Sequence, residues 1–174
     1  MNIPGYRTLQ MSARWLRSRF SGGALILGYH RVAAPAWDPY EMCVTPHHFA
    51  QQLEALRDHA NPLSLTALLR ALGDGKLPPR AVAVTFDDAY ADVLSQAKPL
   101  LEGYRIPATV FVTSAYLGRA YWWDEVERLL RPPTPVPARI SLAIGDTPFE
   151  WPPGRHTRGD ARTALLLALC DRLR

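Results

Sequence analysis

The sequence predicts a mainly parallel α/β fold. Apolar stretches rich in β-branched residues at 24–32, 81–86 and 107–113 alternate with segments in which apolar residues repeat at helical spacing. Breaker residues separate these segments, as Pro78 and Pro79 do before 81–86. Strands that alternate with helices are typical of parallel sheets covered by helices.

The N-terminal region predicts a basic amphipathic helix. The first 37 residues contain no Asp or Glu, and within residues 7–20 apolar positions recur at helical spacing among several arginines. Two interpretations stay open, a helix on a membrane surface or a helix packed across the domain. We expect a basic segment over 1–23 and one further domain over 24–174.

Capping residues predict where the next helices begin. The apolar run 24–32 is expected as the first buried strand. Thr45 followed by Pro46 predicts an N-cap and a first helical turn, and Ser64 predicts the start of a second, shorter helix.

A second strand and helix follow in the same order. The run 81–86 predicts a buried strand, and 90–101 predicts a helix closed by Gly103. The β-branched and aromatic run 107–113 predicts a third strand.

The last third of the chain has a looser pattern. Residues 121–130 predict a helix, and 139–150 predict a hairpin that turns at Gly145 and Asp146. A final amphipathic helix is expected over 157–173.

Composition indicates a globular domain. At 174 residues, with 48% hydrophobic and 21% charged residues, the chain is long enough to bury a core. The net charge of +4 comes almost wholly from arginine, without a dense basic cluster, so we expect no nucleic-acid partner. Cys43 and Cys170 match no metal or disulfide spacing.

No targeting pattern is recognised in the sequence. It contains no run of 18 apolar residues and no apolar core of a signal peptide. We therefore expect a cytoplasmic location, with the inner membrane surface as an alternative if 7–20 contacts lipid.

Two adjacent carboxylates, Asp87 and Asp88, follow the predicted strand 81–86 directly. Parallel α/β proteins bind ligands at the carboxyl ends of their strands. One carboxylate of such a pair can hold a divalent ion while the other acts as general base on its water. Two alternatives stay open. Asp88 would be only a helix N-cap, or the pair would hold Mg²⁺ for phosphoryl chemistry, without the glycine loop typical of it.

Three motifs carry a resemblance to a known family. The run TFDDAYADV, preceded by ILGYHRV and followed by GYRIPATVFVT, resembles the polysaccharide deacetylase family, also called carbohydrate esterase family 4 or the NodB-homology domain. The resemblance covers residues 24–117 and, more loosely, YWWDEVERLL. It implies a distorted (β/α) barrel of the polysaccharide deacetylase type. It also implies metal-dependent hydrolysis of N-acetyl or O-acetyl groups on a polysaccharide or glycan precursor.

The resemblance also assigns roles to residues. Asp87 is implied as the catalytic base and Asp88 as a ligand of Zn²⁺ or another divalent metal, with Ala89 where the family has glycine. Tyr29 and His30 are expected as pocket residues at the same rim, with a core position as the alternative for His30.

The family completes its metal site with two histidines in a motif of the form H(S/T)xxH. None of the five histidines has that spacing, namely His30, His47, His48, His59 and His156. His47 and His48 are expected as exposed residues of a first helical turn. The chain therefore resembles the N-terminal part of the domain, so we expect an incomplete barrel. We expect self-association or a second chain to cover its open edge.

Two functional hypotheses follow from the resemblance. The first is a metal-dependent deacetylase of an acetylated glycan, whose activity in this chain alone is in question. The second is a catalytically inactive remnant that binds a glycan or a partner protein.

Overall fold

The computed structural model describes residues 23–133, 135, 139–151 and 161–173, and these form two compact units. The first unit comprises the described residues up to Ala36 together with Met42–Thr113. The second comprises Trp37–Glu41 and the described residues from Ser114 onward. The basic helix predicted at 7–20, with its membrane contact, lies outside the described residues, as does His156.

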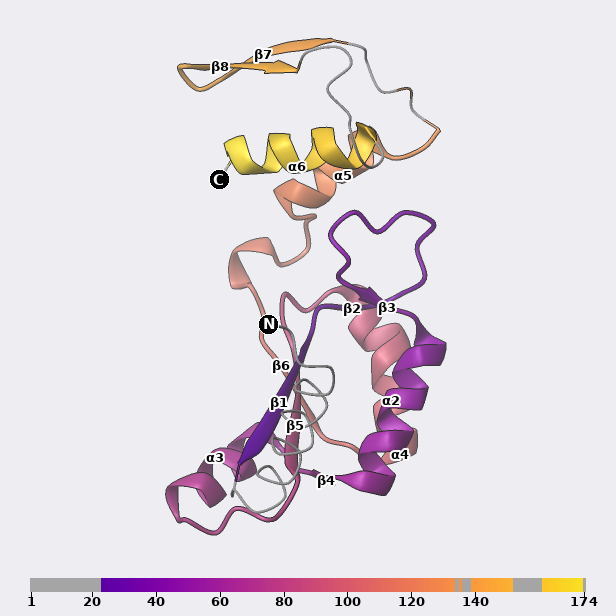
Figure 1. Cartoon of the computed structure of the whole chain (residues 1–174), viewed down its shortest axis with the longest axis vertical. Helices are drawn as coiled ribbons and strands as arrows, with labels where there is room; N and C mark the ends of the chain where they lie inside the picture. The colour runs from indigo at the N-terminus through magenta and orange to yellow at the C-terminus, as the bar shows by residue number, and fades with distance from the viewer. Residues whose placement is uncertain (1–22, 134, 136–138, 152–160, 174) are drawn as a thin grey trace, which may run out of the picture. The chain divides into compact units, whose positions relative to one another are not determined.

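A parallel four-stranded sheet forms the centre of the first unit (Figure 1). β5 (Ala81–Phe86) pairs along its whole length with β1 (Ala24–Tyr29). Its other side pairs with β4 (Asn61–Pro62) at the start and with β6 (Ala108–Val110) at the end. The predicted strand 81–86 and the mainly parallel arrangement are thus confirmed.

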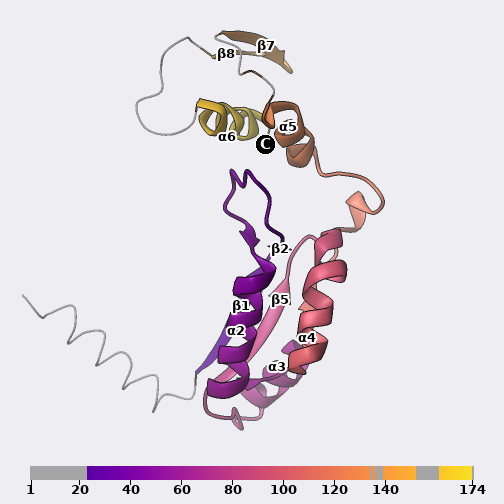
Figure 2. The ribbon, with the colours of Figure 1, turned by 90° about the vertical axis from the view of Figure 1, so that its right-hand side faces the viewer.

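Helices cover both faces of this sheet (Figure 2). α2 (Pro46–His59) and α4 (Lys98–Tyr104) lie against one face, and α3 (Leu65–Gly73) packs against the other. The predicted starts of α2 and α3 are confirmed. Thr45 Oγ1 accepts a hydrogen bond from the His48 backbone nitrogen, and Ser64 Oγ accepts one from that of Ala67, each over 3.2 Å.

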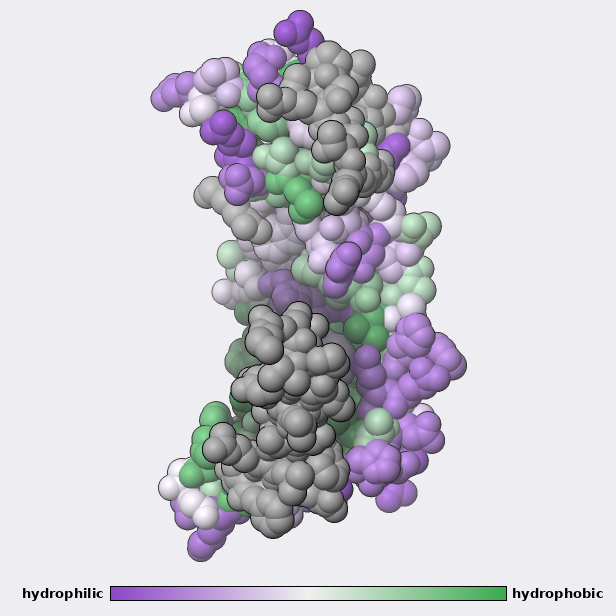
Figure 3. All heavy atoms as spheres, in the orientation of Figure 1, coloured by the Kyte–Doolittle hydropathy of each residue, from purple (hydrophilic) through white to green (hydrophobic). Residues whose placement is uncertain are grey.

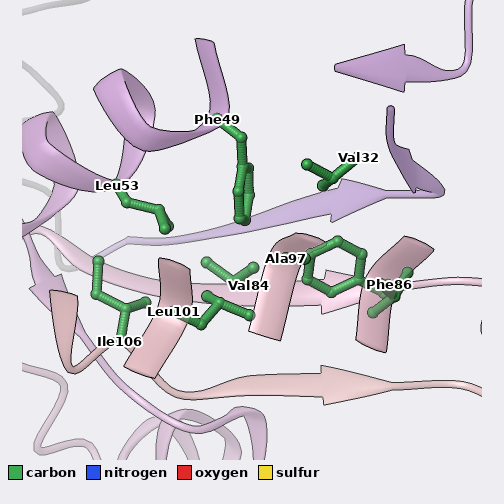
Figure 4. Packing of buried hydrophobic residues seen from close by; sticks show 9 residues of the cluster. Val32, Phe49, Leu53, Val84, Phe86, Ala97, Leu101 and Ile106 are labelled. Carbon is green, nitrogen blue, oxygen red and sulfur yellow. The ribbon is translucent and has the colours of Figure 1, made fainter. Parts of the chain in front are cut away.

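Alternating residues of β5 supply the core. Val84 and Phe86 face α2 and α4, where Phe49, Leu53 and Leu101 meet them (Figure 4). Ala81 and Ala83 face α3 on the other side. All six residues of β5 are buried, as a central parallel strand requires.

The predicted boundaries of two elements are corrected. The strand predicted over 24–32 is broken by a bend at His30, after which β2 (Arg31–Val32) pairs with β3 (Cys43–Val44). The helix predicted over 90–101 contains a π-helical turn, η1 (Val93–Ala97), and its α-helical part is α4. Gly103 lies within α4 and does not close it.

The C-terminal end of α4 explains that last difference. Arg105 adopts a left-handed conformation, with φ of 57°, and the Ile106 backbone nitrogen donates to the Leu101 carbonyl over 3.0 Å. This is the bond pattern of a Schellman ending, in which a hydrophobic contact also fixes the end of the helix. Here Ile106 and Leu101 belong to the same buried cluster, so their burial outweighs the usual preference for glycine.

The second unit is a small α+β assembly. It contains the short 3₁₀ turn η2 (Ser114–Tyr116), α5 (Trp122–Leu130), the hairpin of β7 (Ile140–Ile144) and β8 (Thr147–Trp151), and α6 (Ala161–Leu173). The predicted hairpin is confirmed, with Gly145 at its turn. Its buried cluster consists of Leu130, Phe149, Leu165, Leu166, Leu169 and Cys170.

Several apolar side chains are at the surface of the first unit. Figure 3 shows hydrophobic side chains over α3, where Leu69 and Leu72 are about half exposed.

The strand predicted over 107–113 is shorter in the structure, where only β6 forms a strand. Within the described part of the chain, no helix has the length and apolar character needed to cross a membrane.

Candidate active site

The acidic pair lies at the carboxyl end of the central strand. Asp87 and Asp88 follow β5 directly, and the Asp87 backbone nitrogen donates to the Tyr29 carbonyl over 2.9 Å. The pairing of β1 with β5, in which Tyr29 lies opposite Phe86, thus continues one step beyond the strands. The pair lies where parallel α/β proteins bind ligands.

The backbone at this point adopts a conformation that is uncommon for residues other than glycine. Asp88 has φ of 65° and Ala89 has φ of 50°, and the Ala89 backbone nitrogen donates to the Asp87 carbonyl over 2.9 Å. A left-handed conformation costs a residue with a Cβ roughly 1–2 kcal/mol. Such strain persists where surrounding contacts hold it, and it concentrates at functional sites.

The Asp88 carboxylate is held from a neighbouring strand. Thr113, just beyond β6, donates its Oγ1 hydrogen bond to Asp88 Oδ1 over 3.2 Å. The residue at the N-cap position of η1 is Asp92. The interpretation of Asp88 as the cap of this helix is therefore wrong.

The Asp87 carboxylate has a different environment. Among the described residues, none makes a hydrogen bond or an ion pair with it. Its side chain is partly exposed. An unpartnered, partly exposed carboxylate at a strand end is available to accept a proton from water.

The two other predicted rim residues have different positions. Tyr29 lies on the helix-covered face, where its ring packs against Phe49 and Phe86 with centroids 5.2 and 5.5 Å away. Its hydroxyl donates to Gln52 of α2 over 2.9 Å. The Tyr29 ring is partly buried against the core cluster, and burial raises its pKa, while its role as a pocket residue stays a prediction.

His30 lies at the bend between β1 and β2 and is partly exposed. The register that sets Tyr29 opposite Phe86 brings His30 and Asp87 to adjacent positions at the rim. His47 and His48 are exposed in the first turn of α2, as predicted.

The described residues do not fit a complete metal site. No group of three or more His, Cys, Asp and Glu side chains among them is arranged to hold an ion. Catalytic zinc sites use three protein ligands. Asp87 and Asp88 are carboxylates of a suitable kind, but a third donor beside them is not found in this part of the chain.

Sequence reasoning missed an ion pair next to the acidic pair. Asp92 Oδ2 accepts from Arg31 Nε over 2.9 Å, and the guanidinium carbon of Arg31 lies 4.7 Å from the centroid of the Tyr90 ring. Burial disfavours the Arg31 charge, but the hydrogen bond and the charge of Asp92 outweigh it and raise the Arg31 pKa. A signal for this pair was available in the sequence, because the ionisable residues Arg31 and Asp92 lie within the recognised motifs ILGYHRV and TFDDAYADV.

An open cavity adjoins this ion pair. Its volume is about 550 Å³, and Arg31, Tyr90 and Asp92 line it together with Ser95 and Gln96. Small apolar residues of β2 and the following loop complete its wall.

These features define an α/β protein with a strained acidic pair at the carboxyl end of a buried parallel strand, an arrangement suited to acid–base catalysis. Residues 74–136 match the family described as polysaccharide deacetylase. The sequence motifs, this match and the structural neighbours described next agree that part of the chain is similar to a polysaccharide deacetylase domain.

The curated relatives agree with this family. The chain is 32% identical over 108 residues to the poly-beta-1,6-N-acetyl-D-glucosamine N-deacetylase of Staphylococcus aureus (strain N315), covering 55% of this chain and 37% of the relative. It is 33% identical over 110 residues to the enzyme of the same name from Staphylococcus epidermidis. The chain thus spans little more than a third of the length of these relatives.

Solved structures show the same fold. IcaB from Ammonifex degensii is 29% identical with a TM-score of 0.51, covering 62% of this chain and 48% of that one. A de-N-acetylase from Aggregatibacter actinomycetemcomitans is 25% identical with a TM-score of 0.50, covering 61% of this chain and 50% of that one.

Proposed function

We propose that this chain contributes the acidic side of an active site that hydrolyses N-acetyl groups on a polymer of acetylated amino sugars. The observation that carries the proposal is the acidic pair at the end of β5, where the strained turn of Asp88 and Ala89 sets the free carboxylate of Asp87 beside that of Asp88, which Thr113 holds. The relatives named above as N-deacetylases support the N-acetyl group as the target, and O-acetyl groups are the alternative.

Asp87 is the proposed general base. A water oxygen adds to the acetamide carbonyl carbon while Asp87 takes one of its protons. The carbon–nitrogen bond then breaks, acetate forms, and the nitrogen takes up a proton and leaves as the sugar amine. The partly exposed carboxylate of Asp87, unpaired among the described residues, is suited to this exchange.

Asp88 is the proposed ligand of a divalent ion, with zinc as the first choice. The hydrogen bond from Thr113 orients its carboxylate, as bonds from neighbouring residues orient metal ligands. The described residues supply no set of three ligands, so the ion and its remaining donors belong to the proposal.

The sheet itself supports a barrel. β1, β5, β4 and β6 are parallel, with α2 and α4 packed against one face, and we propose that they form an arc of a (β/α) barrel. Among the described strands β1 pairs only with β5, and Leu25 and Ile26 on it are 55% and 50% exposed. A second chain or a second copy is the proposed cover of this edge, and light scattering of the purified chain tests it. A cytoplasmic location stays a prediction.

A deacetylation assay with matched variants tests the proposed function. The substrate is a β-1,6-linked N-acetyl-D-glucosamine oligomer, and the readouts are released acetate and new free amine. Asp87→Asn is expected to lower turnover by about 100-fold or more. Asp88→Ala is expected to weaken Zn²⁺ binding in calorimetry. Asp74→Asn changes an exposed carboxylate at the end of α3 and is expected to alter neither.

The same assay distinguishes the second hypothesis, an inactive remnant that binds glycan, from an active deacetylase. The absence of a three-ligand set among the described residues favours a remnant that binds glycan without hydrolysing it. No turnover by the unaltered chain, with equal oligomer binding by all three variants, would support that remnant and contradict the deacetylase.

A further inference from the structure

The loop that carries the acidic pair is fastened to one neighbouring segment at both of its ends. At its start, the Asp87 backbone nitrogen donates to the Tyr29 carbonyl over 2.9 Å. At its end, Asp92 Oδ1 accepts from the Val32 backbone nitrogen over 3.1 Å, and Asp92 Oδ2 accepts from Arg31 Nε over 2.9 Å. The strained turn of Asp88 and Ala89 lies between these two attachments.

The second attachment is shielded from water. The Asp92 side chain is 14% exposed and that of Arg31 is 26% exposed. Exposed ion pairs contribute little because water screens them, whereas a half-buried carboxylate that uses both oxygens is strongly oriented. The stacking of Arg31 on Tyr90 also holds the guanidinium on the loop side.

The bonds of Asp92 are not those of a helix cap. Asp92 stands at the N-cap position of η1, yet its side chain makes no capping hydrogen bond there. Both of its oxygens bond to β2 across the loop, to residues 60 and 61 positions earlier in the chain. Its geometry serves the attachment of the loop and not the start of the helix.

We propose that Asp92 and Arg31 are positioning residues of the candidate active site. By fastening the end of the loop to β2, they hold Asp88 and Ala89 in the left-handed conformation and keep the carboxylate pair at the carboxyl end of β5. A strained turn persists only when the surrounding structure over-determines it, and this ion pair is the attachment on the C-terminal side. The inference rests on the proposed function for its catalytic consequence, but the backbone geometry that it explains is independent of that function.

Variants of Asp92 separate its two contacts. Asp92→Asn keeps an oxygen for the Val32 nitrogen but removes the charge that Arg31 meets, and Asp92→Ala removes both contacts. Arg31→Lys keeps the charge without the planar group that stacks on Tyr90. The matched control is Asp58→Ala, which removes an arginine–aspartate pair of the same 2.9 Å length in exposed positions of α2.

Nuclear magnetic resonance of the full chain gives the first readout. The intraresidue HN–Hα coupling and the backbone carbon shifts of Asp88 and Ala89 report the sign of φ. We expect positive φ in the unaltered chain and in Asp58→Ala, and its loss in Asp92→Ala, with a smaller change in Asp92→Asn. In Asp92→Ala combined with Ala89→Gly, the left-handed turn is expected to return in part, because glycine adopts it without strain. Unchanged φ at both residues in folded Asp92→Ala and Asp92→Asn overturns the proposal.

Turnover of the acetylated oligomer gives the second readout. Asp92→Ala is expected to lower kcat by about tenfold or more, with KM changed by less than about twofold, because a displaced base misaligns the reaction without removing a substrate contact. Unchanged kcat per folded molecule, with only reduced thermal stability, would mean a merely structural role and overturn the proposal. If the unaltered chain shows no turnover, the proposed function fails, while the resonance measurement still decides the role of Asp92.

Discussion

Thr113 Oγ1 donates a hydrogen bond of 3.2 Å to Asp88 Oδ1 and so joins the residues just beyond β6 and β5. The two residues are 25 positions apart in the chain, and the parallel pairing of β5 with β6 brings them together. The side chain of the second aspartate is thus fixed by the sheet itself. The acidic pair lies in one loop after β5, and a residue from beyond the neighbouring strand β6 holds the carboxylate of Asp88.

Removal of this hydroxyl is expected to destabilise the first unit. Thr113→Val keeps the shape of the side chain but leaves Asp88 Oδ1 without this donor, which is expected to lower the free energy of unfolding by about 1 kcal/mol. Thr113→Ser keeps the donor and is expected to retain more of the stability. The measurement is chemical denaturation followed by circular dichroism.

A control separates the loss of the hydrogen bond to Asp88 from the general effect of replacing threonine by valine. Thr66 is exposed on α3. Thr66→Val is expected to change stability by less than about 0.5 kcal/mol. Equal effects of Thr113→Val and Thr66→Val would show that the bond to Asp88 contributes nothing.

Glycine at position 89 is expected to stabilise the chain. Ala89 has φ of 50°, a conformation in which Cβ is strained, so Ala89→Gly removes the strain while it adds entropy to the unfolded chain. The net gain is expected to be about 0.5 kcal/mol. Ala91→Gly is the control and is expected to change the unfolding free energy in the opposite direction. Ala91 is at an exposed helical position, where glycine costs about 0.5–1 kcal/mol. A loss of stability in both variants would contradict the strain at Ala89.

Burial of α2 against the sheet sets the stability of the first unit. Leu53 is fully buried in the cluster that contains Val84 and Phe86. Leu53→Ala is expected to cost about 2–5 kcal/mol in unfolding free energy, measured by denaturant titration. Leu94, which is 69% exposed in η1, gives the control, because Leu94→Ala removes little buried area. A cost below about 1 kcal/mol for Leu53→Ala would contradict this packing.

The sequence predicted the parts of the fold that depend on local chemistry. Thr45 and Ser64 begin their helices because each side-chain oxygen accepts from a backbone nitrogen three residues on. The strand 81–86 was predictable because every residue in it is buried, which requires an uninterrupted apolar run. Gly145 marked the hairpin turn because its φ is 58°.

The features that the sequence did not predict depend on contacts between distant segments. The bend at His30 ends β1 early because β2 pairs with β3 instead, and that pairing leaves no mark in the run 24–32. The ending of α4 at Arg105 depends on the burial of Ile106 in the core. Helix-ending preferences describe single residues, so Gly103 was predicted as the end of this helix.

The candidate site was predicted in the same uneven way. Asp87 and Asp88 were recognisable from their motif and from their place after a buried strand. Thr113, which bonds to Asp88, follows β6, and Arg31, which pairs with Asp92 at the end of the same loop, lies in β2, so only the register of β1, β5 and β6 brings these residues near the pair. The packing of the Tyr29 ring against Phe49 and Phe86 was not predicted for the same reason, since alternation along β1 decides which face the ring takes.

The second unit is expected to lose stability at alkaline pH through Tyr40. Burial raises the pKa of this phenol above its ordinary value of 10.0, and its contact with Cys170 Sγ at 3.1 Å acts in the same direction. The folded chain therefore keeps the Tyr40 proton at pH values where the unfolded chain loses it. Because the folded state then binds more protons, the contribution of Tyr40 to the unfolding free energy is constant well below pH 10 and falls as the pH rises above it. Tyr40→Phe removes this ionisation, so the stability of the variant is expected to fall less steeply between pH 9.5 and pH 11. The measurement is denaturant unfolding of both proteins, followed by tryptophan fluorescence. Trp122 and Trp123, which pack against this core, contribute to that signal. Equal slopes for the two proteins would show that Tyr40 titrates normally in the folded chain.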